Sequence, residues 1–104
     1  MKELSVNYKN MEWEECGGYP KGTQMKMLRY GEDTKTFLLK LPPGFNMQDH
    51  SHLATEQHFV LEGEYDSGGI TYATGTYRYI PAHANHGPFI SEKGAIVLVV
   101  YTCN

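Results

Sequence analysis

Turn-forming residues interrupt this chain at short intervals, and that spacing limits what it can fold into. Glycine, aspartate and serine gather at 31–34, 66–69 and 91–94, a composition typical of tight turns. The runs between these turns are short and show no sustained helical period. We therefore predict an all-β sandwich or barrel, with a short extended piece at 50–53 and strands over residues 24–30, 35–41, 56–62, 70–72, 76–80 and 95–101.

The first 22 residues differ from the rest. They carry no regular β pattern, and the sequence Gly-Gly-Tyr-Pro at 17–20 breaks any regular element. We expect residues 1–22 to form an N-terminal strap or arm, with Met11 and Trp13 packed on the outside, and residues 23–104 to form one β-barrel domain.

Composition excludes several classes of function. The net charge is -3 and the charges are spread along the chain, so nucleic-acid binding is not expected. The longest apolar run, 95–101, is too short to span a membrane, and the N-terminus shows no signal peptide. Cys16 and Cys103 fit neither a metal-binding nor a disulfide spacing. We therefore expect a reduced, cytoplasmic protein.

Histidines and a glutamate point to a metal centre. His50 and His52 are two residues apart, so they share a face of an extended strand, and the same holds for Glu56 and His58. Together with His86, these residues offer imidazole and carboxylate ligands, which suit transition metals better than calcium or magnesium. A His-x-His pair alone is a weak signal, because it also occurs as polar decoration on a strand.

The spacing around these residues resembles the cupin superfamily. Gly44, His50, His52, Glu56 and Gly63 match its first motif position for position, and Gly75, Pro81 and His86 match most of its second. Two positions depart from the second motif: His83 stands where glycine is usual, and Ile90 stands where asparagine is usual. The stretch 56–94 is similar to the subgroup that contains the C-terminal domain of ChrR anti-sigma factors and acetylacetone-cleaving dioxygenase-like proteins.

The resemblance implies a fold and a ligand set. The fold would be the cupin double-stranded β-helix, a jelly-roll barrel. It would hold one divalent transition metal per chain, iron, manganese, zinc or nickel, on His50, His52, Glu56 and His86. Glu56 has an alternative role, in which it accepts a hydrogen bond from a ligand histidine instead of binding the metal. Small cupins often form homodimers, and an N-terminal strand exchanged between subunits would cover an open sheet edge.

Two further residues are candidates beside the metal. His58 could contact a substrate or act as an acid or base, and could equally be a structural histidine. Tyr65 could hydrogen-bond a ligand, although Tyr65, Tyr72, Tyr77 and Tyr79 are more typical of a core or barrel wall. The expected core residues are Phe37, Leu39, Val60, Ile80, Val97 and Val99.

Three functions remain open from the sequence. The first is a metal-dependent enzyme, such as a dioxygenase acting on a small diketone-like carbonyl compound, or an isomerase or lyase that uses the same metal. The second is a non-catalytic sensor or regulatory module like the ChrR C-terminal domain, although no second Cys- and His-rich motif for a zinc-binding partner domain is present. The third is a structural remnant without chemistry, which the intact ligand spacing disfavours.

Overall fold

The computed structural model describes residues 2–48, 50–51 and 53–103, and for residues 50, 51 and 86 it describes the backbone alone. Within this part of the chain the structure is all-β apart from one 3-10 turn, η1 (Tyr8–Asn10). The strands are β1 (Glu14–Glu15), β2 (Gln24–Tyr30), β3 (Thr34–Leu41), β4 (Phe45–Met47), β5 (His50–Ser51), β6 (Ala54–Ser67), β7 (Ile70–Ala73), β8 (Tyr77–Ile80), β9 (Asn85–His86), β10 (Phe89–Ser91) and β11 (Ala95–Cys103).

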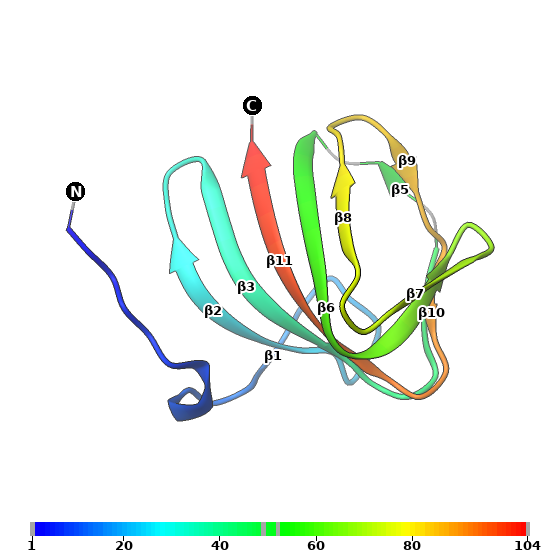
Figure 1. The fold of residues 1–104 in the computed structure, drawn as a ribbon, viewed down its shortest axis with the longest axis horizontal. Helices are drawn as coiled ribbons and strands as arrows, with labels where there is room; N and C mark the ends of the chain where they lie inside the picture. Colours follow the sequence, from blue (N-terminus) through cyan, green and yellow to red (C-terminus); the bar gives the residue numbers. More distant parts are fainter. Residues whose placement is uncertain (1, 49, 52, 104) are drawn as a thin grey trace.

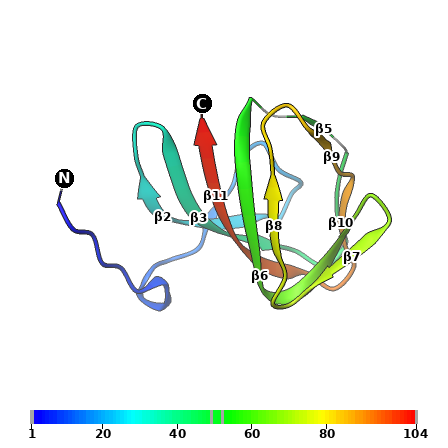
Figure 2. The same cartoon turned by 45° about the horizontal axis from the view of Figure 1, so that its top comes forward.

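The strands form a curled antiparallel sheet. Its order is β1-β2-β3-β11-β6-β10-β4, with β7 and β8 also paired to β6, and β5 pairs separately with β9. Figures 1 and 2 show β2, β3, β11, β6 and β8 lying side by side, while β7 and β10 curve round to face them. The sheet therefore closes over an interior, as in a jelly-roll barrel. The all-β prediction is confirmed.

The long strand β6 joins the two walls of the barrel. Before Gly63 it pairs with β11 and β8, and after Gly63 it pairs with β7 and β10. Gly63 has a φ of 70°, and a Cβ added there would meet the carbonyl oxygen of Gly94 at 2.3 Å. Only glycine tolerates both conditions. The strand predicted over 56–62 was too short, because Gly63 bends the strand and lets it continue to Ser67.

The predicted set of strands was also incomplete. The short strands β4 and β10 were not predicted, and they pair with each other, Phe89 opposite Met47. Each is only three residues long, too short for its alternation to stand out in the sequence.

His83, where the motif usually has glycine, keeps a left-handed φ of 68°. The loop thus retains the backbone shape that the glycine would favour.

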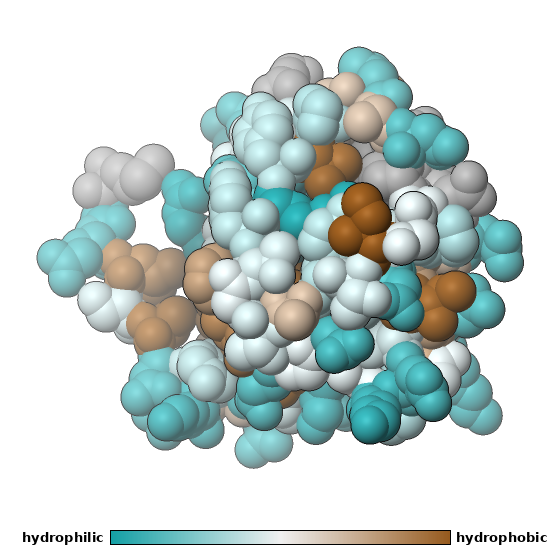
Figure 3. Space-filling model, turned by 45° about the vertical axis from the view of Figure 1, so that its right-hand side comes forward, coloured by the Kyte–Doolittle hydropathy of each residue, from teal (hydrophilic) through white to brown (hydrophobic). Residues whose placement is uncertain are grey.

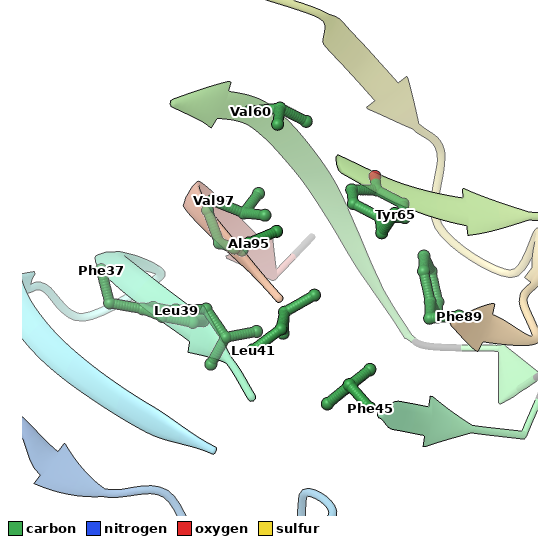
Figure 4. Close-up of a cluster of buried hydrophobic side chains, with 10 residues drawn as sticks. Phe37, Leu39, Leu41, Phe45, Val60, Tyr65, Phe89, Ala95 and Val97 are labelled. Carbon is green, nitrogen blue, oxygen red and sulfur yellow. The ribbon is translucent and has the colours of Figure 1, made fainter. Parts of the chain in front are cut away.

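The core fills the space between the two walls. Figure 4 shows side chains from β3, β6 and β11 directed toward Phe45, Tyr65 and Phe89 on the opposite side. All six core residues predicted from the sequence are buried, namely Phe37, Leu39, Val60, Ile80, Val97 and Val99. Tyr65 belongs to this core, whereas Tyr77 and Tyr79 are exposed on the outside of the wall.

The N-terminal residues lie outside the barrel. Trp13 packs on the outer face, with its ring 4.5 Å from Lys26 Nζ and 5.3 Å from Lys40 Nζ. The segment that precedes Trp13 projects from the barrel as an arm (Figure 3). Its apolar residues Leu4 and Val6 are exposed. Tyr19 behaves differently, because it reaches the core cluster. The boundary placed after residue 22 stays a prediction.

Candidate metal centre

The two histidine motifs meet in the backbone. Strands β5 and β9 are antiparallel, with His50 opposite His86 and Ser51 opposite Asn85. Residues opposed in this way have Cα atoms about 5 Å apart. The fold therefore brings together two motif histidines that are 36 positions apart in the sequence (50 and 86).

Three of the four predicted ligands lie wholly or in part outside the described residues. His52 lies outside the described residues, and so do the side chains of His50 and His86. Among the side chains that the structure describes, no three histidines, cysteines or carboxylates come together as a metal site. Glu56 is the one predicted ligand with a described side chain, and the ligand set stays a prediction.

Glu56 lies on the inner face of β6, as the alternation of the strand predicts. It is only 7% exposed and lines an interior cavity with an accessible volume of about 40 Å³. A buried carboxylate needs a charged or hydrogen-bonding partner, so its position inside the barrel points to a specific role.

The cavity has a small polar part and a larger apolar part. Its polar lining residues are Tyr19, Glu56, His58 and Tyr65. The remaining lining residues are apolar: Leu39, Leu41, Phe45, Met47, Phe89, Val97 and Val99. Pockets of this kind bind small organic ligands, with the few polar groups setting the orientation.

His58 is the immediate neighbour of Glu56 inside the barrel. It is also 7% exposed, and its Nε2 lies 3.0 Å from Oε1 of Glu56. Its Nδ1 lies 2.8 Å from the hydroxyl oxygen of Tyr65. The prediction that His58 shares the inner face with Glu56 is therefore confirmed, and both of its ring nitrogens have partners.

Arg78 completes this group and was not predicted from the sequence. Arg78 stands opposite His58 in the pairing of β8 with β6, and its Nη1 donates to the Tyr65 hydroxyl oxygen at 3.2 Å. Its guanidinium also lies 4.0 Å from the ring centre of Tyr72, a cation–π contact. In the run 77–79 the arginine lies between two tyrosines that face outward. Because side chains alternate along a strand, this pattern could have predicted that Arg78 faces inward.

Burial shapes the acidity of two tyrosines in the cavity. Desolvation raises the pKa of Tyr65, and the hydrogen bond from Arg78 opposes that shift. Desolvation also raises the pKa of Tyr19, with the negative charge of Glu56 adding to the effect. Both phenols are therefore neutral hydrogen-bonding groups at physiological pH. Tyr19 belongs to the irregular N-terminal segment, where no pattern in the sequence marked it.

A curled antiparallel barrel with a buried carboxylate and paired histidine strands defines the cupin class. The sequence also matches a family model, described as the ChrR cupin-like domain, over residues 1–103. The chain belongs to this family. A search of curated protein sequences gave no match.

Solved structures agree on the fold. A proposed acetylacetone dioxygenase from Methylibium petroleiphilum PM1 superposes with a TM-score of 0.86 at 20% identity, covering 98% of this chain and 78% of that chain. The polyketide cyclase RemF from Streptomyces resistomycificus also gives 0.86 at 19% identity, covering 99% and 81%. A chain of the Rhodobacter sphaeroides complex of SigE with the anti-sigma ChrR gives 0.72 at 23% identity, covering 92% of this chain and 51% of that chain. The cupin fold predicted from the sequence is confirmed.

Proposed function

We propose that this protein is a metal-dependent enzyme acting on a small carbonyl compound, with a dioxygenase reaction on a diketone-like substrate as the best candidate. The observation that carries this proposal is a buried carboxylate, Glu56, in the polar part of a cavity that is otherwise apolar. Such a cavity suits a compact organic molecule with one or two polar atoms.

The residues present fit a transition metal. His50, His52, Glu56 and His86 would hold one divalent ion, iron, manganese, zinc or nickel, because imidazole and carboxylate are the ligands these ions prefer. The pairing of His50 with His86 in the backbone supports this grouping. A bound ion with open positions would supply a Lewis acid for the carbonyl oxygens of the substrate. The apolar side chains would exclude water, and Tyr19 would offer a hydroxyl group.

The lining of the cavity favours one class of substrate over others. Among the lining residues that the structure describes, there is no lysine and no arginine. Apart from the proposed metal ion, a dicarboxylate would therefore find no cationic partner for its second charge in this lining, and a buried charge needs such a partner. Acetylacetone and polyketides, which appear in the names of two structural neighbours, are carbonyl compounds with apolar bodies. Because the cavity is small, we expect a substrate of a few carbon atoms, or movement of the flexible Met47 to admit a larger one.

Metal analysis followed by an oxygen-uptake assay tests this proposal. The protein is purified without a metal-affinity step, alongside His52→Ala and His86→Ala. We expect about one equivalent of a transition metal per chain, lost in both variants with the β-fold retained. We then expect oxygen uptake with pentane-2,4-dione after anaerobic loading with Fe(II). Unchanged metal content in both variants would refute the ligand assignment.

A second candidate is a non-catalytic sensor or regulatory module. The family match and the similarity to a chain of the SigE–ChrR complex favour it. In that case the loaded protein would bind a small carbonyl compound without consuming oxygen or producing any product. Calorimetric binding of pentane-2,4-dione without turnover, with each of the four metals in turn, would favour this candidate over the enzyme.

We also propose that the protein is a homodimer. A row of apolar side chains crosses the outer face of the barrel wall, since Leu38, Leu98, Phe59 and Tyr77 are in register on β3, β11, β6 and β8. Phe59 is 41% and Tyr77 is 54% exposed. Leu38 is buried within the single chain, so the exposed part of the row is the end formed by Phe59 and Tyr77. Exposed apolar groups mark interaction surfaces, and a second copy would cover this end and the apolar side of the arm.

The setting and the remaining partners are also proposed. Among the described residues, no helix is long and apolar enough to cross a membrane. Cys16 and Cys103 are free thiols, which suits a reducing, cytoplasmic environment. With a net charge of -3, we propose that the protein binds neither nucleic acid nor a membrane surface.

A further inference from the structure

Four side chains form a continuous hydrogen-bonded chain inside the barrel. It runs from Arg78 through Tyr65 and His58 to Glu56, with distances of 3.2, 2.8 and 3.0 Å between successive polar atoms. Tyr65 is 1% exposed, so water does not compete for its hydroxyl group. The first three members come from two strands, Arg78 from β8 and both Tyr65 and His58 from β6, and none of them was predicted to bind the metal.

The chemistry of each group sets the direction of every bond. Arginine only donates, so the Tyr65 oxygen accepts from Arg78. An ionised carboxylate only accepts, so Nε2 of His58 must carry a proton and donate it to Glu56. When the imidazole is neutral, its Nδ1 is therefore bare and accepts the hydroxyl proton of Tyr65. With these assignments, every proton between the four residues has an acceptor.

From this we infer that the neutral form of His58 is the tautomer with its proton on Nε2, and that His58 is a positioning residue that fixes how the Glu56 carboxylate faces the cavity. Arg78 and Tyr65 act through His58 by keeping the proton off Nδ1. His58 is then neither a metal ligand nor a base for the substrate, because both nitrogens are occupied. The positioning role rests on the proposed metal centre, whereas the tautomer does not.

The arrangement is rigid at its far end. Arg78 stacks on Tyr72 at 4.0 Å, and its strand holds it opposite His58. Tyr65 packs edge-on against His58, with ring centres 6.0 Å apart, and against Phe89 at 5.5 Å. Groups that orient metal ligands typically change metal affinity 10–100-fold when removed, and a rigid chain of this kind is suited to that task.

The first measurement reads the tautomer in the metal-free protein. Nitrogen-15 NMR of the imidazoles is recorded at a pH of about 8.5, well above the ordinary histidine pKa of about 6.5. The His58 signals are assigned as those missing from His58→Gln. We expect a pyrrole-type Nε2 and a pyridine-type Nδ1, and a weaker preference in Tyr65→Phe. The reverse tautomer in the wild-type protein would overturn the inference, whatever the metal content.

The second measurement reads positioning through metal affinity. Tyr65→Phe should weaken binding of the metal found in the purified protein by about 10-fold or more. The matched control is Tyr77→Phe, which removes a hydroxyl group that donates to Gln57 on the outer face at 2.5 Å and should leave affinity unchanged. Equal affinity in both variants would refute the positioning role.

A second pair of variants guards against misfolding of Tyr65→Phe. In His58→Gln the amide nitrogen replaces Nε2 as the donor to Glu56, so affinity should stay within a few-fold of wild type, whereas His58→Leu should lose at least 10-fold. Equal losses in both would count against the inference. If the tautomer is as expected but the wild-type protein binds no metal at all, the proposed function fails and the tautomer assignment stands.

Discussion

The two faces of β6 differ in an unusual way. The inner face carries the polar residues Glu56 and His58, each 7% exposed, whereas the outer face carries Phe59, which is 41% exposed. In a sheet with one buried face, apolar residues normally point inward and polar ones outward. The usual pattern is thus inverted over a few residues, while Val60, fully buried, restores it.

We interpret each inversion as the mark of one proposed function. Buried polar residues destabilise a fold unless they are paired, and the inner residues are paired in a hydrogen-bonded chain. Exposed aromatic residues favour association, and the outer face has several. Tyr77 and Tyr79 follow Phe59 on the same side. The inner inversion belongs to the proposed metal site and the outer one to the proposed dimer.

The largest expected effect is on metal affinity. It comes from removing the carboxylate on the inner face of β6 in one variant and adding one on the outer face in another. Glu56→Gln keeps an acceptor for His58 but removes the negative charge, so we expect metal affinity to fall more than 100-fold, beyond the range for residues that only orient ligands. Gln57→Glu places a carboxylate one residue away on the outer face and is the matched control. Metal titration of both variants checks this. A loss in Gln57→Glu equal to that in Glu56→Gln would remove the distinction between the faces.

The next effect tests the bend that lets one strand serve both walls. Gly63→Ala places a Cβ 2.3 Å from the carbonyl oxygen of Gly94 at a positive φ, so we expect a loss of about 2–3 kcal/mol in the free energy of unfolding. Gly68→Ala is the control, since its φ is also positive but no atom lies within 4 Å of its added Cβ. That variant should lose about 1 kcal/mol. Urea denaturation measures both, and equal losses would contradict the role of the Gly94 contact.

A third effect concerns the outer face alone. Phe59→Ser should raise the dimer dissociation constant at least 10-fold, since it removes an aromatic group from the centre of the apolar row, and should leave metal content unchanged. Ile70→Ser is the control, because Ile70 is exposed on β7, away from the row. Analytical ultracentrifugation distinguishes the two. A monomeric wild-type protein would refute the dimer.

The smallest expected effect is a change in the free energy of unfolding at high pH. It concerns the buried tyrosines of the cavity. The pKa values of Tyr19 and Tyr65 are raised by burial, so the folded state retains protons that the unfolded state loses above a pH of about 10. Their contribution to stability is therefore complete below that pH and is lost as the pH rises toward the folded pKa values. Between these limits each tyrosine changes the free energy of unfolding by about -1.4 kcal/mol per pH unit.

Tyr19→Phe removes one of these groups and should make the loss of stability above pH 10 less steep by that amount. Tyr79→Phe changes an exposed tyrosine and serves as the control. Denaturant unfolding at a series of pH values from 9 to about 11.5 measures the slopes. An identical pH dependence for Tyr19→Phe and wild type would contradict the burial of the Tyr19 hydroxyl group.

Much of the barrel could be predicted from local patterns. The turn at 31–34 and the strand after it were visible because turn preference and the alternation of side chains along a strand depend on near neighbours. The same alternation placed Glu56 and His58 on the inner face. The strands β4 and β10 were not predicted because three residues carry too little periodicity; they form because β10 pairs with both β4 and β6.

The sequence by itself determined the class of fold and the types of residue available for chemistry. Motif spacing and the inward or outward direction of side chains are properties of neighbouring residues, and a single strand already defines them. Only the tertiary structure decided which residues meet. It set Arg78 opposite His58, brought Tyr19 from the N-terminal segment to the cavity, and pressed Gly63 against Gly94. Contacts such as these depend on closing long loops between distant segments, and no short stretch of sequence records that closure.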